Sequence, residues 1–303
     1  MDLQRALYSY YDEVLLRCVP EEARTRDADD AAKVLGLYRA IHLHGTVAED
    51  ELAAREDEAL VDELCRPYLA WRRWRSRWRL VGRKGGRAVL QRNDGMLISA
   101  PESCCRPVSG KRSSSEGEYE VALTALRRRA LPGWVVLDGA PPNSVPLDGR
   151  VYISLSPDGL EDGWHTLMAA LRGSGVLYQA KVVNNRDAAR RPDCCVVYVP
   201  RSSVPEVASL VDQVLPHDVR DELTPGFALP ESRGVAVALA PADRPLASHG
   251  LTCAEEIWMA IREEVPGPCT KATAWRHLQA LLERQRVRLD GRPESLEVEA
   301  RRV

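Results

Sequence analysis

The pattern of hydrophobic and polar positions is most informative between residues 149 and 201. Residues 151–155 form a β-branched and aromatic run that ends in Ser-Pro-Asp-Gly, a strong turn signal. Apolar residues at helical spacing then predict a helix from Trp164 to Leu171, which the glycines at 173 and 175 end. Two apolar runs, residues 176–183 and 194–199, predict strands buried on both faces. The predicted order is strand, helix, strand, loop, strand.

Lys181 is the one cation in the strand predicted from 176 to 183. Because side chains alternate along a strand, Lys181 can simply point outward to solvent. Alternatively, it lies in a partly dry cleft and faces the arginine-rich loop at 184–193. Desolvation and neighbouring cations there favour the neutral amine that a general base requires. The pattern leaves both interpretations open.

The chain before residue 70 predicts helices. Apolar residues recur at helical spacing in residues 3–15, 31–43 and 48–68. A basic and aromatic segment follows, in which Trp71, Trp74 and Trp78 are interleaved with arginines. The tryptophan spacing is compatible with a stripe that faces the core, with the arginines in solvent. A surface that contacts phosphate or peptide is the second interpretation, and single-stranded nucleic acid is the third.

The remaining pattern predicts short strands first and helices towards the end. Residues 87–91 and 96–99 flank Asn-Asp-Gly and predict a hairpin, and residues 119–126 and 134–137 predict strands separated by a connection. A helix at 204–215, a Pro-rich loop at 216–230, a strand at 234–239 and helices at 253–264 and 270–286 follow. We expect an α+β fold: an N-terminal helical part with a small β element (1–110), packed on a mixed β-sheet flanked by helices (111–303). The two parts form either two domains or one.

Composition narrows the class of protein. The chain has 303 residues, 45% of them hydrophobic and 28% charged, which is typical of a soluble globular protein. A net charge of −2 gives no reason to expect nucleic acid or an anionic membrane as a partner, and no apolar run is long enough to span a membrane. None of the eight cysteines forms a C-x-x-C pair, so we expect reduced thiols, a cytoplasmic location and no structural metal.

Several short motifs occur together in one order. They include Arg150-Val151-Tyr152, Lys181 three residues after Tyr178, Arg191-x-Asp193, Gly234-Val235-Ala236 and Ser248-x-Gly250, with Leu37-Tyr38, Trp78-Arg79 and Leu131-Pro132-Gly133-Trp134 upstream. Through these residues the chain resembles the HopA effector family, named after a plant-pathogen type III effector. The resemblance covers residues 35 to 295 approximately and so includes most of the chain.

The resemblance implies a phosphoserine/phosphothreonine lyase. HopA-like proteins of class V lanthipeptide and thioamitide biosynthesis, which are pathways of ribosomal peptide maturation, act after an aminoglycoside-phosphotransferase-like kinase has phosphorylated a precursor peptide. The lyase then eliminates phosphate and leaves dehydroalanine or dehydrobutyrine. The implied partners are therefore the phosphorylated precursor peptide and such a kinase. Neither a metal nor an organic cofactor is required.

Elimination needs a base for the Cα proton, cations for the leaving phosphate and a proton donor, and the resemblance directs attention to particular residues. Lys181 is the candidate base, with His42 and Tyr152 as candidate catalytic partners. Phosphate-binding candidates are Arg191, Arg190 and Arg79, since guanidinium groups bind phosphate in a bidentate manner. Asp193 and Tyr178 are candidates for orienting these groups. For His42 the alternative is a histidine that stabilises a helix C-terminus, and for the tyrosines it is a place in the core.

Three alternatives to a lyase follow from the same sequence. A non-catalytic HopA-like protein that binds the kinase or the precursor peptide is supported by two departures from the family pattern, AWRRWRSRW at residues 70–78 and LTCAEE after Gly250. A nucleic-acid binder would use residues 71–79, and the near-neutral net charge argues against it. An effector that acts on a host is disfavoured because no Ser-rich leader opens the sequence.

Overall fold

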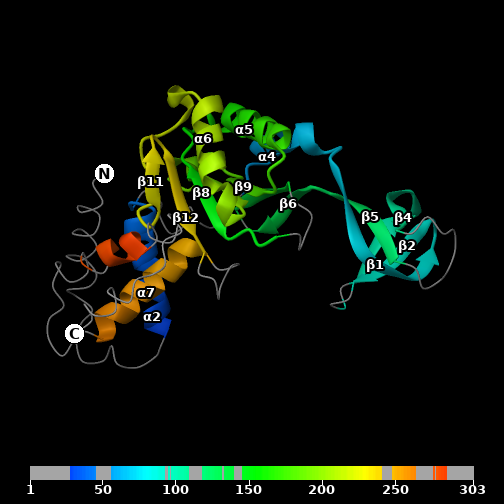
Figure 1. Ribbon diagram of the computed structural model, residues 1–303, viewed down its shortest axis with the longest axis horizontal. Helices are drawn as coiled ribbons and strands as arrows, with labels where there is room; N and C mark the ends of the chain where they lie inside the picture. Colours follow the sequence, from blue (N-terminus) through cyan, green and yellow to red (C-terminus); the bar gives the residue numbers. More distant parts are fainter. Residues whose placement is uncertain are drawn as a thin grey trace.

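The structure is a computed structural model that describes residues 28–45, 56–92, 95, 97–108, 118–131, 133–139, 145–240, 248–263, 276 and 278–284. Its strands form a seven-stranded and a five-stranded sheet. Figure 1 shows the seven-stranded sheet between the five-stranded sheet at one end and a group of helices at the other. The α+β class predicted from the sequence is confirmed. The helix predicted at residues 3–15 lies outside the described residues.

The seven-stranded sheet has the order β11-β12-β8-β10-β9-β7-β6. Its three central strands, β8, β10 and β9, are the strands predicted around residues 151–155, 194–199 and 176–183. The strands are β6 (Leu126–Leu131), β7 (Trp134–Asp138), β8 (Gly149–Ile153), β9 (Gln179–Val183), β10 (Cys195–Val199), β11 (Leu229–Ser232) and β12 (Val235–Leu239). The sequence pattern missed β6 and β11, because their polar residues and prolines are typical of connections.

The prediction of a mixed sheet is wrong for the described strands, since every pairing in both sheets is antiparallel. The strand–helix–strand unit of β8, α5 (Leu160–Ser174) and β9 does place its two strands parallel to each other. However, β10 lies between them and pairs antiparallel with both. Apolar runs predict burial, but they do not reveal that a later strand is inserted between two earlier ones.

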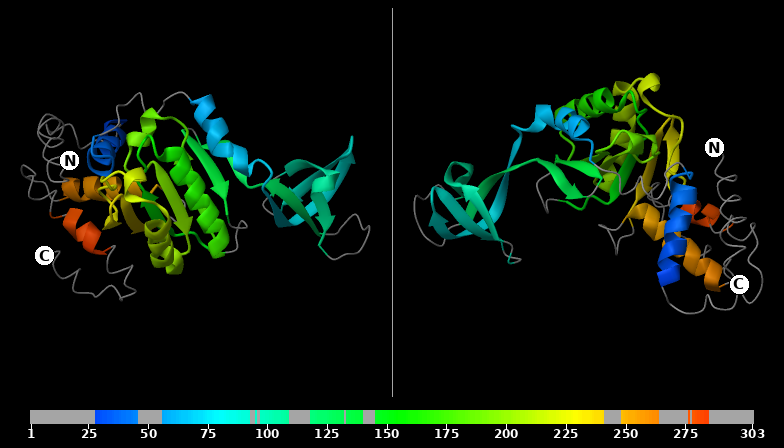
Figure 2. Two further views of the ribbon diagram at one scale, coloured as in Figure 1. Left: turned by 90° about the horizontal axis from the view of Figure 1, so that it is seen from above. Right: turned by 180° about the vertical axis from the view of Figure 1, so that it is seen from behind.

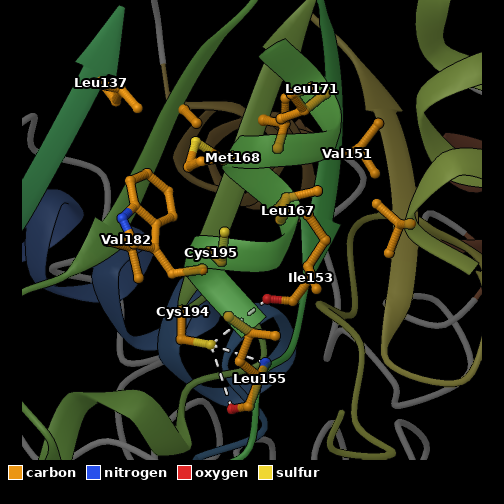
Figure 3. Close-up of a cluster of buried hydrophobic side chains, with 14 of the residues drawn as sticks. Leu137, Val151, Ile153, Leu155, Leu167, Met168, Leu171, Val182, Cys194 and Cys195 are labelled. Atoms are coloured by element: carbon orange, nitrogen blue, oxygen red, sulfur yellow. Dashed lines mark hydrogen bonds between the residues drawn. The ribbon is translucent and has the colours of Figure 1, made fainter. Parts of the chain in front are cut away.

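One face of this sheet is covered by helices. Leu167, Met168 and Leu171 of α5 pack against Val151, Ile153 and Val182, and α6 (Val204–Val214) and α4 (Glu58–Cys65) extend the same core (Figure 3). α5 ends at Ser174 and is capped by Gly175, whose φ of 76° is the left-handed conformation that glycine adopts readily, as the pattern predicted. Because this face is sealed, the strand residues that point the other way are the ones available for function.

Cys194 lies in this core rather than at a reactive surface. Its Sγ accepts a hydrogen bond from the Leu155 backbone N at 3.1 Å and lies 3.5 Å from the Ile153 carbonyl oxygen (Figure 3). Burial raises the pKa of the Cys194 thiol to about 12. The six cysteines within the described residues, at 65, 104, 105, 194, 195 and 253, form no disulfide bond.

The five-stranded sheet forms a projecting unit, which we call the β-lobe. Its order is β3-β2-β1-β5-β4, from β1 (Arg72–Lys84), β2 (Arg87–Arg92), β3 (Leu97–Pro101), β4 (Cys105–Pro107) and β5 (Glu118–Thr124). Figures 1 and 2 show it standing away from the rest of the molecule. The hairpin predicted around Asn-Asp-Gly is present as β2 and β3. The boundary predicted at residue 110 falls inside this sheet, because β4 pairs with β5.

The tryptophan-rich segment forms the strand β1, for which the sequence pattern gave no element. From residue 74 to residue 80, arginines at every odd position alternate with Trp74, Ser76, Trp78 and Leu80, which is the period of a strand. Trp78 is buried in the β-lobe core, whereas Arg79 is exposed. A spacing of four residues fits one face of a helix and one face of a strand equally well, so the tryptophans alone could not decide.

Helices from both ends of the described chain pack together beside the central sheet. They are α2 (Ala28–Leu37), the π-helical turn η3 (Tyr38–His42), α7 (His249–Glu263) and the helical residues 278–284. Leu37, Ile41, Phe227, Ile257 and Leu278 lie in their shared core. Figure 2 shows α2 and α7 at the end opposite the β-lobe. Within the described residues, no helix is long and apolar enough to cross a membrane.

Candidate functional site

The candidate site lies on the sheet face that α5 and α6 do not cover. The strand register places Lys181 opposite Val196 and Val196 opposite Tyr152, so these side chains share one face. The next row on this face contains Gln179, Tyr198 and Arg150. Lys181, Gln179 and Tyr198 are half-buried, in contrast to the fully buried residues of the helix-covered face. Lys181 therefore lies on a partly open face of the sheet, among cationic and aromatic side chains.

Lys181 contacts two aromatic rings. Its Nζ lies 4.0 Å from the ring centroid of Trp134 and 5.7 Å from that of Tyr198. Within the described residues, this nitrogen makes no hydrogen bond or ion pair. The observed position of Lys181 therefore lies between the two predicted ones, because the side chain is neither free in solvent nor sealed in the core. Cation–π contact of this kind holds the lysine head over the sheet while leaving its N–H groups available.

Arg191 and Asp193 form a buried, bidentate ion pair beside Lys181. Nε of Arg191 donates to Oδ1 of Asp193 at 2.8 Å, and Nη2 donates to Oδ2 at 2.9 Å. The Arg191 guanidinium carbon also lies 5.2 Å from the Trp134 centroid, so this ring contacts both cations. Burial opposes ionisation of Asp193, but the charge and hydrogen bonds of Arg191 outweigh it and lower the Asp193 pKa to about 2.

The N-terminal helical part supplies the other side of this pair. The Tyr38 hydroxyl donates to Oδ2 of Asp193 at 3.3 Å and accepts from Nη2 of Arg191 at 3.1 Å. Both hydrogens of Nη2 are thereby used. Nη1 of Arg191 makes no hydrogen bond with any of the described residues. Asp193 and Tyr38 thus fix one edge of the guanidinium and leave the other edge with two donors.

His42 lies deeper than a proton donor to a substrate requires. It is 1% exposed and stacks on Tyr38 and Phe227 at centroid distances of 5.2 and 5.6 Å, with Tyr152 edge-on at 5.6 Å. Its Nε2 is 4.0 Å from Oδ2 of Asp193. Burial, partly offset by Asp193, lowers the pKa of His42 to about 3, so the imidazole is neutral near pH 7. Tyr152 is similarly buried, and burial raises its pKa.

The buried, neutral His42 predicts a pH-dependent stability. Between pH 6.5 and 4.5 the unfolded chain takes up a proton at this histidine and the folded chain does not, since the folded pKa is about 3. The free energy of unfolding should therefore fall by up to ~1.4 kcal/mol per pH unit as the pH drops through this window. The variant His42→Phe keeps an aromatic ring among Tyr38 and Phe227. Its free energy of unfolding, measured with urea at each pH, should fall less steeply with pH, because one proton fewer is taken up on unfolding. An equal pH dependence in the parent and in His42→Phe would contradict a buried, neutral His42.

Gly250 explains how α7 approaches this network so closely. A Cβ at this position would lie 2.6 Å from Cε2 of Tyr38 and 2.8 Å from Cδ2 of His42. We expect Gly250→Ala to displace both rings and to lower the free energy of unfolding by ~1–3 kcal/mol. Gly173→Ala in α5 is the matched control, because its Cβ would meet no atom within 4 Å and alanine favours the helix. Equal stability of the two variants in urea unfolding would contradict the close packing.

The other predicted site residues lie elsewhere. Tyr178 points into the helix-covered core, where its ring occupies the space beside Gly139, so it does not face Lys181. Arg79 lies on β1 in the β-lobe, away from β9, and donates to Gln91 Oε1 at 3.0 Å (Figure 1). Arg190 is exposed at the end of η6 (Asp187–Arg190). The structure thus gathers Lys181, Arg191, Asp193, His42 and Tyr152, of which only Lys181 is partly open.

Three members of the assembly were missed as site residues, and Trp134, whose ring contacts both Lys181 and Arg191, is the first of them. Tyr198 is one of the rings near Lys181, and only the register between β9 and β10 brings it there. Tyr38 binds Asp193 across 155 residues of sequence. All three were visible only as family motif residues or strand residues. Among the described residues, no group of three or more His, Cys, Asp or Glu is placed to hold a metal ion.

Comparison with known proteins places the chain in a family. Two solved effector proteins from Pseudomonas syringae are similar: that of pathovar tomato strain DC3000 (13% identity, TM-score 0.44, 93% of this chain and 95% of that chain) and that of pathovar syringae strain 61 (12%, 0.45, 93% and 93%). No curated protein sequence matched. A model of the HopA1 effector protein family matches residues 133–291, more than half of the chain. The resemblance seen in the sequence motifs is therefore confirmed, and the chain belongs to the HopA1 effector protein family.

Proposed function

We propose that this protein is a phosphoserine/phosphothreonine lyase that eliminates phosphate from a phosphorylated peptide. The observation that carries the proposal is the half-buried Lys181, with an unbonded Nζ, beside an Arg191 whose free edge faces no protein acceptor among the described residues. A base and a phosphate-binding guanidinium are the two groups that β-elimination needs most. Trp134 contacts both, so one rigid ring sets their separation.

The proposed reaction balances with these groups. Nζ of Lys181 takes the Cα proton of the phosphorylated residue, and the electron pair left on Cα forms the Cα=Cβ double bond. The Cβ–O bond breaks, and its electrons leave with phosphate, whose charge the Nη1 donors of Arg191 stabilise. The products are inorganic phosphate and a dehydroalanine or dehydrobutyrine residue. In this scheme Asp193 and Tyr38 act only as positioning residues, because they hold Arg191 without reaching the substrate.

The substrate class follows from the family resemblance and from this chemistry. We propose a precursor peptide phosphorylated on Ser or Thr, made by an aminoglycoside-phosphotransferase-like kinase in a lanthipeptide or thioamitide pathway. Neither a metal nor an organic cofactor enters the proposed steps.

Mass spectrometry of a phosphopeptide deuterated at Cα tests this proposal. Incubation with the purified protein should remove phosphoric acid and should also remove the deuterium, because the Cα–D bond is broken. A phosphatase would instead return serine with deuterium retained, and this outcome would contradict a lyase. The unphosphorylated peptide is the control, and it should remain unchanged.

A non-catalytic partner is the second candidate function, and one observation favours it. The two predicted proton donors, His42 and Tyr152, are both buried and cannot reach a peptide in this conformation. A protein that only binds would hold the phosphopeptide, detected by fluorescence anisotropy, and leave both phosphate and deuterium in place. The same incubation therefore separates the two candidates.

A further inference from the structure

The β-lobe differs strongly in charge from the rest of the chain. Residues 72–124 contain twelve Lys and Arg against five Asp and Glu, a net charge of +7. Since the whole chain has a net charge of −2, the remainder carries −9. Figures 1 and 2 show the lobe projecting at the end of the molecule opposite α2 and α7. A basic unit held away from an acidic body will attract an anionic partner without help from the rest of the surface.

One face of the lobe concentrates exposed cations. The register places Arg79 beside Gln91 and Leu97, and Lys84 beside Arg87 and Pro101, on the face opposite Trp78 and Leu90. Arg79, Lys84 and Arg87 are all exposed, and none of them forms an ion pair with a described residue. By contrast, Arg106 on β4 is paired with Glu120 at 2.7 Å. The unneutralised cations therefore lie over β1, β2 and β3.

The two edges of this sheet are not equivalent. β4 is three residues long and carries Arg106 and Pro107, features that discourage pairing with another strand. β3 has the sequence LISAP, without a charge, and among the described strands it pairs only with β2. Its Leu97 is 59% exposed. An uncharged edge strand beside a basic face is suited to an added strand that carries carboxylates.

The aromatic residues of the lobe favour a polypeptide over single-stranded nucleic acid. Binding of single strands uses exposed rings on which bases stack. Trp78 and Tyr119 are buried inside the lobe, and Trp71 at its base packs on Tyr68 and Arg172. The described rings are therefore occupied by the protein itself. Exposed cations without a free stacking ring among the described side chains match a flexible chain of carboxylates better than they match bases.

We propose that the β-lobe docks an acidic, extended segment of a polypeptide partner, which pairs with the free edge of β3 while its carboxylates contact Arg79, Lys84 and Arg87. This docking is separate from the proposed elimination, because Lys181 lies on β9 in the central sheet. Main-chain hydrogen bonds to β3 supply affinity, and the cations select an acidic sequence. The same contacts explain why a protein with a net charge of −2 maintains a strongly basic unit.

Fluorescence anisotropy tests the proposal with a labelled peptide of alternating Glu and Val. We expect salt-sensitive binding that Arg79→Glu/Lys84→Glu weakens by about tenfold or more. Arg201→Glu/Arg233→Glu, which changes the net charge equally at exposed arginines outside the lobe, should bind like the parent. A peptide of the same sequence with N-methyl groups at alternate residues should bind the unmodified protein more weakly, because it cannot pair as a strand. Lys181→Ala should bind fully, since docking does not depend on the elimination.

Four results would overturn the proposal. They are absence of peptide binding, equal weakening by the two double variants, equal binding of the N-methylated peptide, and tighter binding of a thymidine oligonucleotide than of the peptide at the same salt. Sedimentation velocity tests a different occupant, a second copy of this chain. Self-association that is lost in Arg79→Glu/Lys84→Glu, together with no binding of the peptide, would assign the surface to that second copy and would reject the peptide.

Discussion

Replacing Lys181 by alanine is expected to slow elimination of phosphate from a phosphopeptide by about 10²–10⁴-fold, the usual contribution of a positioned general base. The reason is geometric: Lys181 is the half-buried amine over Trp134, and its Nζ has no bond to any described residue. Single-turnover mass spectrometry at saturating peptide measures the loss. Because Lys181 lies on a partly open face, the variant should keep the circular dichroism spectrum and the urea midpoint close to those of the parent.

Lys181→Arg distinguishes a base from a cation at this position. Arginine preserves the charge and the contact with Trp134, but it does not give up its proton near neutral pH. If Lys181 is the base, Lys181→Arg should be as inactive as Lys181→Ala, and both should retain binding of the phosphopeptide. Substantial activity in Lys181→Arg would instead assign Lys181 to phosphate binding, and it would leave the base to be found elsewhere.

The central residues of the candidate site could be proposed from the sequence more readily than their surroundings. An isolated cation in an apolar strand drew attention to Lys181, and the family resemblance drew attention to Arg191 and Asp193, which the structure shows in contact. Their neighbours depend on long-range geometry. Tyr198 reaches Lys181 only through the antiparallel register of β9 and β10, and Tyr38 reaches Asp193 from a helix 155 residues earlier. The periodicity of hydrophobic residues along the sequence does not predict contacts between such distant segments.

The same distinction applies to the fold. The runs that became β8, α5, β9 and β10 were predicted from local pattern, because burial and turn residues are local properties. The insertion of β10 between β8 and β9 was not predicted, since strand order is fixed by packing of distant segments. The position of Tyr178 follows, by contrast, from a local rule: it is three residues from Lys181, so strand alternation places it on the opposite face, inside the helix-covered core.

Asp193→Asn should be the most destabilising single substitution at the site. The amide keeps the shape of the carboxylate but leaves the buried Arg191 without its anion, and Tyr38 without a charged acceptor. Breaking a buried pair in this way costs ~3–5 kcal/mol. Urea unfolding at pH 7 measures the loss. Glu222→Gln is the matched control, because its pair with Arg233 is exposed and should contribute less than ~1 kcal/mol.

The stability that the Arg191–Asp193 pair provides should also depend on pH, which gives a second, independent test. The folded pKa of Asp193 is about 2, below the ordinary value of 3.8. Stability from the pair is therefore complete above pH 4 approximately, and it is lost as the pH falls towards 2. Asp193→Asn should remove this acid-dependent component, which His42→Phe leaves in place.

A replacement of both partners by apolar residues, Arg191→Met/Asp193→Leu, should recover much of the stability and none of the activity, because it removes the buried charge together with the phosphate-binding edge. Loss of stability equal to that of Asp193→Asn would show that the fold requires the ion pair itself, and that Arg191 serves structure before it serves phosphate.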